Sequence, residues 1–263
     1  MFPIRDDNPT FRTPYATFVI IAVNVCAWVF AQGLGTNPSL AASICSLGLV
    51  PGELLALVPA GTRFPVGPQT LCVLTPGEGY YTVVSSMFMH GSWMHIIGNM
   101  WFLWIFGNNV EDAMGSLRFV VFYLLCGLGA AGLQVAADPA STIPMVGASG
   151  AIGGVMGAYV LLYPRVKVHL LVFLGFFITT IAVPAIFMLG YWFLVQVLGG
   201  FTSLNAAGGG VAFWAHVGGF VAGVVLILVF RDRRLLAQHP FHGWQKDRSG
   251  SRSWHRIDRG KDR

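Results

Sequence analysis

The sequence contains very few charged residues for its length. Only 10% of its 263 residues are Asp, Glu, Lys or Arg, while 55% are hydrophobic and the mean hydropathy is +0.65. Soluble domains typically have about 25% charged residues, because their surfaces face water. Charge is absent altogether from residues 13–52, 64–77, 79–110 and 168–230. This absence excludes an ordinary soluble domain and indicates that much of the surface faces lipid.

Cysteine is also scarce. The chain has 4 cysteines, too few for a disulfide scaffold. Cys26 and Cys126 fall in expected helices, where a small buried hydrophobic side chain is the natural interpretation. Cys45 and Cys72 fall in one long loop, and they could pair if that loop faces an oxidising compartment. Sequence alone does not give the distance between them, so the pairing stays open.

Long apolar segments make up most of the chain. A helix that crosses a bilayer needs about 20 mainly apolar residues, so this length suits one bundle of about six spans. We therefore expect an all-α membrane protein with a six-transmembrane-helix bundle. The first apolar segment follows Arg5 and Arg12 as a secretory signal would, but its length and the later spans favour a retained helix. The expected spans are residues 14–31, 81 or 93 to 110, 117–137, 147–163, 184–198 and 211–230, with 166–183 at the membrane interface.

Polar segments divide the chain into a membrane domain with two tails. Residues 1–12 form a short arm, residues 13–230 the membrane domain and residues 231–263 a basic tail. Inside the membrane domain, residues 34–79 form a long connection between the first two spans. Its apolar stretch 53–58 is expected to form a short interfacial helix. A loop of this length with partial structure of its own is typical of a functional element.

The distribution of basic residues predicts the orientation. With six spans both termini lie on one side, which then holds the ten Lys and Arg of the tail and five others, while the opposite side holds only Arg63. Basic residues concentrate in cytoplasmic loops. We expect a multi-pass protein of the inner (plasma) membrane with both termini in the cytoplasm and loop 34–79 outside. The basic tail is expected to contact anionic lipids, and its position argues against nucleic-acid binding.

Four polar side chains stand out inside the expected spans, where such groups are costly and usually functional. They are His95, Asn99, Ser149 and His216. Their three helices all run from outside to inside under this topology, and each residue falls within the first few turns. The four residues therefore share a depth near the extracytoplasmic face, although they played no part in choosing the topology.

Ser149 is the candidate nucleophile. Gly147 and Gly150 flank it, so other backbone can approach the hydroxyl closely. The free N–H groups at the start of a helix also suit a developing oxyanion. The alternative is a serine that only packs between helices, which is common for small residues in membranes.

His216 is the candidate base. A serine hydroxyl is a poor nucleophile until a neighbouring base accepts its proton. Gly219 and Gly223 follow the histidine and give its helix a small-residue face, which would let it approach the helix of Ser149. A histidine that merely bridges helices is the alternative, but it does not explain the glycines around both residues.

His95 and Asn99 are four residues apart and share one helix face. Both can donate hydrogen bonds, as stabilisation of an oxyanion requires. The alternatives are a polar contact between helices and a metal site with His90, His95 and His216 as ligands. The metal site is not favoured, because the sequence has no His-Glu-x-x-His motif and no carboxylate near these residues.

Taken together, these motifs resemble the bacterial type of rhomboid family intramembrane serine protease. The resemblance covers about residues 81–230. It rests on His95-x-x-x-Asn99, on Gly107-x-x-x-Glu111 with Gly115, on Gly147-x-Ser149-Gly150, and on Ala215-His216-x-x-Gly219-x-x-x-Gly223.

The resemblance implies a six-helix bundle around a water-filled cavity, a Ser–His dyad without aspartate, no cofactor, and cleavage of single-span transmembrane protein substrates. It implies that Ser149 is the nucleophile and His216 the general base and acid. His95, Asn99 and the Ser149 backbone N–H would form the oxyanion hole. Glu111 would have a structural role at the cytoplasmic end of the second span.

Two positions depart from the family pattern. Gly153 stands where many members have an aromatic residue that supports the histidine, and Tyr81-Thr82 stands where some have a Trp-Arg pair that anchors the long loop. The main alternative function is a catalytically silent rhomboid-like protein that binds and escorts transmembrane helices, although such a protein would be expected to lose the serine or the histidine. A small-solute transporter is a further alternative, but ion-coupling charges are absent from the spans.

Overall fold

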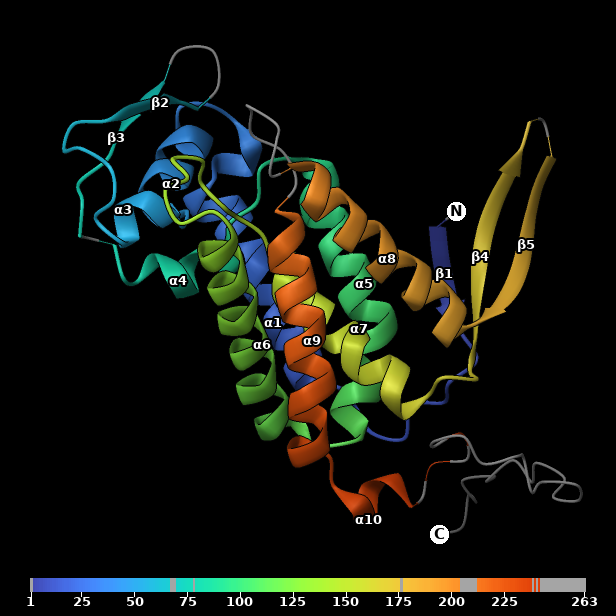
Figure 1. Ribbon diagram of the computed structural model, residues 1–263. Helices are drawn as coiled ribbons and strands as arrows, with labels where there is room; N and C mark the ends of the chain where they lie inside the picture. Colours follow the sequence, from blue (N-terminus) through green and yellow to red (C-terminus); the bar gives the residue numbers. More distant parts are fainter. Residues whose placement is uncertain are drawn as a thin grey trace, which may run out of the picture.

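The computed structural model describes residues 2–66, 70–77, 79–175, 177–203, 212–237, 239 and 241. Long helices stand side by side in a bundle, with a cap of short elements at one end and α10 at the other (Figure 1). The bundle consists of α1 (Tyr15–Cys26), its continuation as a π-helical turn (Ala27–Ala31), α5 (Trp93–Asp112), α6 (Ser116–Ala137), α7 (Ser149–Leu162), α8 (Ala185–Ser203) and α9 (Phe213–Phe230). Each lies close to a span expected from hydropathy.

The cap is formed by the connection between α1 and α5. It contains a 3-10 turn (Gly33–Gly35), α2 (Ser39–Leu47), α3 (Pro51–Leu54), the hairpin of β2 (Arg63–Pro65) and β3 (Leu71–Val73), α4 (Thr82–Ser85) and a second 3-10 turn (Ser86–Phe88); α10 is Arg233–Leu236. The short helix expected at residues 53–58 instead begins at Pro51, which suits a first helical turn. It ends early, and Ala56 beyond it has a φ of 54°.

A disulfide fastens the cap. It joins Cys45 of α2 to Cys72 of β3, with their Cα atoms 5.5 Å apart, so the pairing that the sequence left open is formed. A hydrogen bond also joins the two ends of the cap, because the Tyr81 hydroxyl, just before α4, donates to the Ser46 carbonyl oxygen of α2 at 3.0 Å. Tyr81 therefore anchors the loop at the position where the sequence departs from the family pattern.

The structure also decides where the second span begins. α5 starts at Trp93, because the Oγ of Ser92 accepts the backbone N–H of His95 at 3.2 Å and caps the helix. The apolar stretch before it forms α4 and a 3-10 turn instead. Of the two starting points that the sequence allowed, residue 93 is correct.

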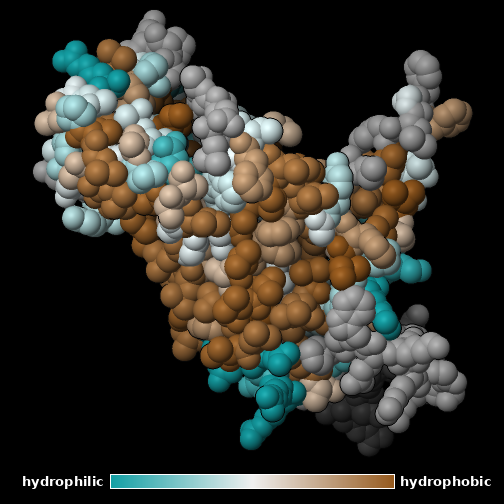
Figure 2. All heavy atoms as spheres, viewed as in Figure 1, coloured by the Kyte–Doolittle hydropathy of each residue, from teal (hydrophilic) through white to brown (hydrophobic). Residues whose placement is uncertain are grey.

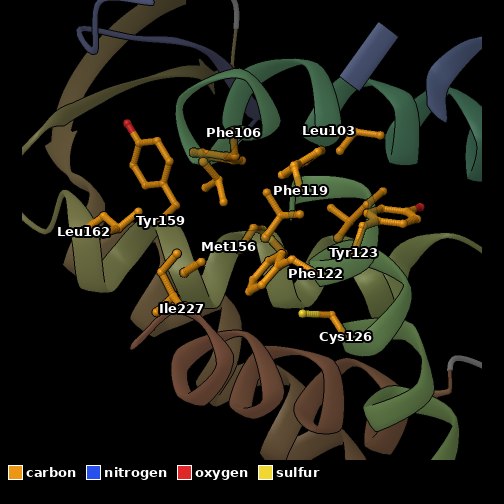
Figure 3. Packing of buried hydrophobic residues seen from close by; sticks show 14 of the residues in the cluster. Leu103, Phe106, Phe119, Phe122, Tyr123, Cys126, Met156, Tyr159, Leu162 and Ile227 are labelled. Atoms are coloured by element: carbon orange, nitrogen blue, oxygen red, sulfur yellow. The ribbon is translucent and has the colours of Figure 1, made fainter. Parts of the chain in front are cut away.

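α7 lies at the centre of the bundle, packed against α5, α6 and α9. Every residue from Gly150 to Tyr159 is buried. A helix that is apolar on all sides is stable only when it is surrounded. Figure 3 shows large side chains of α5, α6 and α9 meeting α7 in one continuous core. The labelled residues are Leu103, Phe106, Phe119, Phe122, Tyr123, Cys126, Met156, Tyr159, Leu162 and Ile227.

Glycines bring α7 and α9 into contact at the backbone. A Cβ atom on Gly219 would overlap the carbonyl oxygen of Gly150, and one on Gly223 would overlap that of Gly154. A Cβ on Gly150 would lie 2.6 Å from that of Ala130 in α6 and 3.6 Å from the Ala215 carbonyl oxygen of α9. Any larger residue would push these helices apart, so the glycines set the spacing of the bundle.

The sides of the bundle are apolar and exposed (Figure 2). Phe187, Tyr191 and Leu194 on α8 and Val229 on α9 are among the exposed large side chains. Within the described residues, α6, α8 and α9 are long and apolar enough to cross a membrane. α1 and α7 are apolar but shorter, and polar side chains lower the hydropathy of α5. The chain is therefore a membrane protein, while the count of six spans stays a prediction.

The expectation of an all-α protein is confirmed only in part, because the mostly helical fold also contains strands. Residues 166–183, expected to lie at the interface of a purely helical fold, fall in a hairpin of β4 (Lys167–Leu174) and β5 (Phe177–Pro184). β1 (Phe2–Asp6) pairs antiparallel with β4, giving the order β1-β4-β5. The segment is rich in Val, Ile, Thr and Phe, which favour strands, and Gly175 adopts a φ of 62° in the turn. Hydropathy alone cannot distinguish such an apolar strand from a helix.

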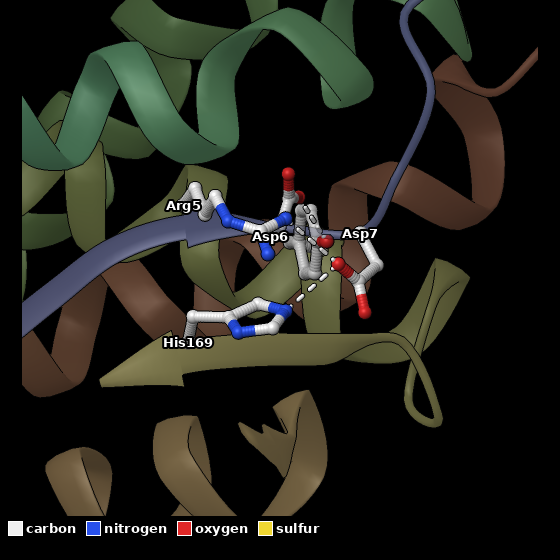
Figure 4. A network of polar contacts seen from close by, with 5 residues as sticks. Arg5, Asp6, Asp7 and His169 are labelled. Atoms are coloured by element: carbon white, nitrogen blue, oxygen red, sulfur yellow. Dashed lines mark hydrogen bonds and ion pairs between the residues drawn. The ribbon is translucent and has the colours of Figure 1, made fainter. Parts of the chain in front are cut away.

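The N-terminal arm is fastened to this sheet and to α7. The Tyr159 hydroxyl of α7 donates a hydrogen bond to Asp6, and His169 Nε2 of β4 lies 2.8 Å from Asp7 Oδ1. Arg5 pairs with the same Asp7 carboxylate at 3.0 Å (Figure 4). Burial raises the pKa of Asp6 to about 6. The arm is thus an ordered strand that contacts both α7 and β4 and holds the two elements together.

Candidate active site

Ser149 and His216 are in hydrogen-bond contact. Ser149 is the first residue of α7, and His216 lies in the first turn of α9. The Ser149 Oγ is 2.7 Å from the His216 Nε2, although the residues are 67 positions apart in the chain. They meet because the glycines described above allow α7 and α9 to touch along their backbones. The geometry matches a serine and its base.

The segment before Ser149 is held by backbone hydrogen bonds. Leu49 of the cap and Met145 exchange two of them, at 3.0 and 2.7 Å. The N–H of Gly147 donates to the carbonyl oxygen of Ser86 at 2.9 Å. Gly147 has a φ of 129°, and a Cβ there would lie 2.6 Å from His95 Nε2. Glycine is therefore required at this position by both backbone conformation and space.

His95 and Asn99 of α5 line the same cavity as Ser149. The Nδ1 of His95 accepts the backbone N–H of Gly91 at 3.3 Å, so its proton is on Nε2, the atom nearest to Gly147. His90 packs edge-on against the His95 ring, with ring centroids 5.1 Å apart. The Asn99 side chain is buried, and its Nδ2 has no hydrogen-bond partner among the described residues. A buried donor without a partner is costly and suits an acceptor that arrives later.

These side chains share a cavity of about 1110 Å³ near the cap. Residues of α5, α6, α7, α8 and α9 contribute to its wall, including Ser149, His216, His95, Asn99 and Trp192. Its volume lies slightly above the usual range for ligand sites in proteins, about 300–1,000 Å³. The cavity is therefore large enough for a segment of a substrate chain to reach the serine.

The sequence analysis missed Gln196 of α8. Its Oε1 lies 2.8 Å from His216 Nδ1, so the imidazole is contacted on both nitrogens. A signal was present: Gln196 is the only amide or charged side chain in α8, and polar groups inside spans are usually functional. It was overlooked because the contact depends on how α8 packs against α9, which the sequence does not give.

Trp192 takes the place of the aromatic residue that is absent at Gly153. Its ring lies against the His216 ring, with centroids 5.7 Å apart and an interplanar angle of 39°. A Cβ on Gly153 would lie 3.1 Å from the His216 carbonyl oxygen and 3.7 Å from the Trp192 ring. Gly153 therefore leaves room for α9 and for the tryptophan. The histidine is supported from α8 rather than from α7.

Glu111 lies at the other end of α5, away from the cavity. Its carboxylate accepts the backbone N–H groups of Ala16 and Thr17 at 2.9 and 2.8 Å, and the hydroxyl of Ser116 at 2.6 Å. These bonds cap the start of α1 and join it to α5 and α6. The position fits the structural role that the family resemblance implies.

Comparison with known proteins agrees with these features. The family model described as "Rhomboid domain" matches residues 77–233, more than half of the chain. The mitochondrial rhomboid protein 1 of Saccharomyces cerevisiae is 31% identical over 155 residues, 55% of this chain and 40% of the relative. The rhomboid protease GluP of Bacillus subtilis is 31% identical over 162 residues, 62% of this chain and 28% of the relative. The rhomboid-like protease 5 of Toxoplasma gondii is 32% identical over 171 residues, 63% and 17% of the two chains.

The chain thus spans less than half the length of each of these relatives. The family model matches most of its membrane domain, from residue 77 onward. That domain contains the paired Ser149 and His216, the glycine contacts between α7 and α9, and the cavity lined by α5. The chain therefore belongs to the rhomboid family.

Proposed function

We propose that this protein is an intramembrane serine endopeptidase that hydrolyses peptide bonds in or near transmembrane segments of other membrane proteins. The observation that carries the proposal is the 2.7 Å contact between the Ser149 Oγ and the His216 Nε2 inside a cavity. Two relatives of the same family are named as proteases, which supports this reading. The reaction needs only a nucleophile, a base and donors for the oxyanion.

In the first step the Ser149 Oγ attacks the substrate carbonyl carbon while His216 Nε2 accepts the hydroxyl proton. The carbonyl oxygen becomes an oxyanion. When the tetrahedral intermediate collapses, His216 gives the proton to the leaving amine and an acyl-enzyme remains. A water molecule then attacks the ester, again with His216 as base, and releases Ser149.

Asn99 and His95 are proposed to stabilise the oxyanion together with the Ser149 backbone N–H. The Asn99 Nδ2 is unpartnered among the described residues, and His95 carries its proton on the nitrogen nearest to Gly147. The Ser149 N–H belongs to the first turn of α7, where backbone N–H groups have no partner within the helix. Donors that are already oriented lower the barrier without reorganising during the reaction.

The substrate is proposed to enter sideways from the lipid, past α8. α8 lines the cavity on one side and exposes large apolar residues such as Phe187 and Tyr191 on the other. A transmembrane helix keeps its carbonyls hydrogen-bonded within the helix. A substrate must therefore unwind near the cavity, and helix-breaking residues should favour cleavage.

Six spans, cytoplasmic termini and an extracytoplasmic site in the plasma membrane form part of the same proposal. The basic residues described above support this orientation. The Cys45–Cys72 disulfide supports it independently, because structural disulfides belong to oxidising compartments and the cap lies at the cavity end of the bundle. The basic tail would then face the anionic cytoplasmic leaflet.

The decisive experiment uses the full chain purified in detergent and a single-span reporter with a helix-breaking residue near its outer end. Wild type is expected to cleave the reporter, and Ser149→Ala and His216→Ala each to lose about 10³-fold or more of the rate. Labelling of Ser149 by a fluorophosphonate tests activation of the serine without depending on the reporter.

Equal cleavage by wild type and both variants would reject the dyad. A wild-type protein that neither cleaves reporters nor reacts with the fluorophosphonate, but retains the reporter helix in a pull-down, would instead support the escort function.

A further inference from the structure

Gln196 is a buried polar side chain on an otherwise apolar helix. It is 7% exposed, and α8 contains no other amide or charged residue. Burying an amide is unfavourable unless its donor and acceptor groups are hydrogen-bonded. Both ends of this amide do have partners, and one partner is His216.

The bonds of Gln196 determine which way its amide points. The Nε2 group donates to the backbone carbonyl oxygen of Trp192, one turn earlier, at 3.3 Å. Oε1 therefore faces His216 Nδ1 at 2.8 Å. The flipped amide would place Oε1 against the Trp192 carbonyl oxygen, two acceptors without a hydrogen between them.

This orientation determines the tautomer of His216. An amide oxygen only accepts, so the Nδ1 atom that faces it must carry the proton. The lone pair on Nε2 is then free, and it points to the Ser149 hydroxyl at 2.7 Å. In serine hydrolases that have a triad, an aspartate holds the histidine in this way.

We propose that Gln196 is a positioning residue that holds His216 in the Nδ1–H tautomer and in the orientation needed to accept the Ser149 proton. The inference rests on the proposed Ser149–His216 chemistry and extends it. A neutral amide oxygen can hold the imidazole in place without adding a charge inside the bundle, where an unpaired carboxylate would be costly. Gln196 is therefore expected to act on the rate of the chemical step rather than on substrate binding.

Two substitutions of Gln196 distinguish its hydrogen bond to the His216 imidazole from its contribution to helix packing. Gln196→Met keeps the length of the side chain but removes the acceptor, so kcat should fall about tenfold or more with little change in KM. Gln196→Glu keeps an acceptor oxygen at the same distance. Its kcat should remain within about threefold of wild type, and the acid limb of its pH–rate profile should move to higher pH, because a carboxylate stabilises the protonated imidazole.

Gln134→Met is the matched control. Gln134 of α6 also bonds to α9, but its Oε1 accepts the backbone N–H of Ala215 at 3.1 Å rather than a proton of the imidazole. Its variant should therefore keep the wild-type pH–rate profile, whatever its effect on stability. If the pH–rate profile of Gln134→Met did shift, then any loosening of α9 would be enough to change the profile. That result would overturn the positioning role proposed for Gln196.

A spectroscopic readout does not depend on turnover. The ¹⁵N signals of the His216 imidazole, identified by their loss in His216→Ala, should report the Nδ1–H tautomer in wild type and a mixture in Gln196→Met. A kcat and a tautomer in Gln196→Met equal to those of wild type would overturn the proposal. If wild type and Ser149→Ala cleave equally, the protease function itself fails, whereas the tautomer measurement still decides the role of Gln196.

Discussion

α9 meets α7 on one side and α8 on the other, and the two contacts are built differently. Against α7 the contact is made by glycines, so that a Cβ on Gly219 or Gly223 would overlap backbone of the other helix. Against α8 it is made by aromatic side chains, with Phe193 and Phe220 ring centroids 4.6 Å apart. In the most apolar part of α8 only 22% of the residues are buried, whereas the corresponding fraction for α9 is 39%. Ser149 and His216 thus belong to the tightly packed pair, whereas Gln196 and Trp192, which contact the imidazole, belong to the loosely packed helix.

The largest effect is expected on the free energy of unfolding, when a glycine of α9 and a glycine of α8 are each replaced by alanine. Gly223→Ala places a methyl group into the Gly154 carbonyl oxygen and should lower the free energy of unfolding by about 3 kcal/mol. Gly190→Ala on α8 meets no atom within 4 Å and should be neutral or stabilising by up to about 1 kcal/mol, because alanine favours helix. Thermal unfolding in detergent checks both. Similar losses in the two variants would contradict the difference between the contacts.

The cavity wall on α5 offers a second contrast with α8. Asn99 has an unpartnered Nδ2 among the described residues, whereas Gln196 is bonded at both ends of its amide. Asn99→Ala should therefore lower kcat about 100-fold without shifting the pH–rate profile, because an oxyanion donor acts only in the transition state. Stability should not fall, since a buried unpaired donor is removed. A profile that shifts as for Gln196→Glu would show that Asn99 acts through the histidine instead.

Trp192 tests whether α8 supports the histidine by packing as well as by hydrogen bonding. Trp192→Leu removes the ring that lies against His216 and should lower kcat about tenfold. Tyr191→Leu is the control, because this neighbouring aromatic residue is 70% exposed on the outer side of α8 and should leave the rate unchanged. Equal rates for the two variants would mean that the ring contact contributes nothing.

The smallest effect on activity is expected from the sheet that connects α7 with α8, where a change of pH acts on stability. Burial raises the pKa of Asp6 to about 6, so the folded arm binds a proton more tightly than the unfolded chain. Attachment of β1 is then strongest below about pH 4 and weakens as the pH rises through 6, by about 2 kcal/mol. Unfolding midpoints of wild type measured from pH 4 to 7.5 should show this slope. Asp6→Asn should flatten it; an unchanged slope would assign it to another group.

The sequence predicted the helices and the Ser149–His216 pair well, because both depend on local or topological patterns. Hydropathy located α6, α8 and α9, and the order of the motifs indicated the family. It failed for β4 and β5, because an apolar run of strand length carries the same hydropathy as a helix.

The residues that support the histidine were not predicted, for a different reason. The family pattern directed attention to Gly153 on α7, whereas Gln196 and Trp192 reach His216 from α8. That contact depends on the packing of two helices, which no periodicity in the chain encodes. Likewise, the Cys45–Cys72 pairing depends on how the cap folds.

α8 is both a wall of the cavity and the element that carries the amide facing His216. If a substrate enters by displacing α8, the same movement draws Gln196 away and leaves Ser149 without an oriented base until the helix returns. Under the proposed function, such an interlock would make the protein inactive while it is open. A transmembrane helix that enters the cavity and keeps α8 displaced would then diffuse away without being cleaved. Only a segment that allows α8 to return to its place would be hydrolysed.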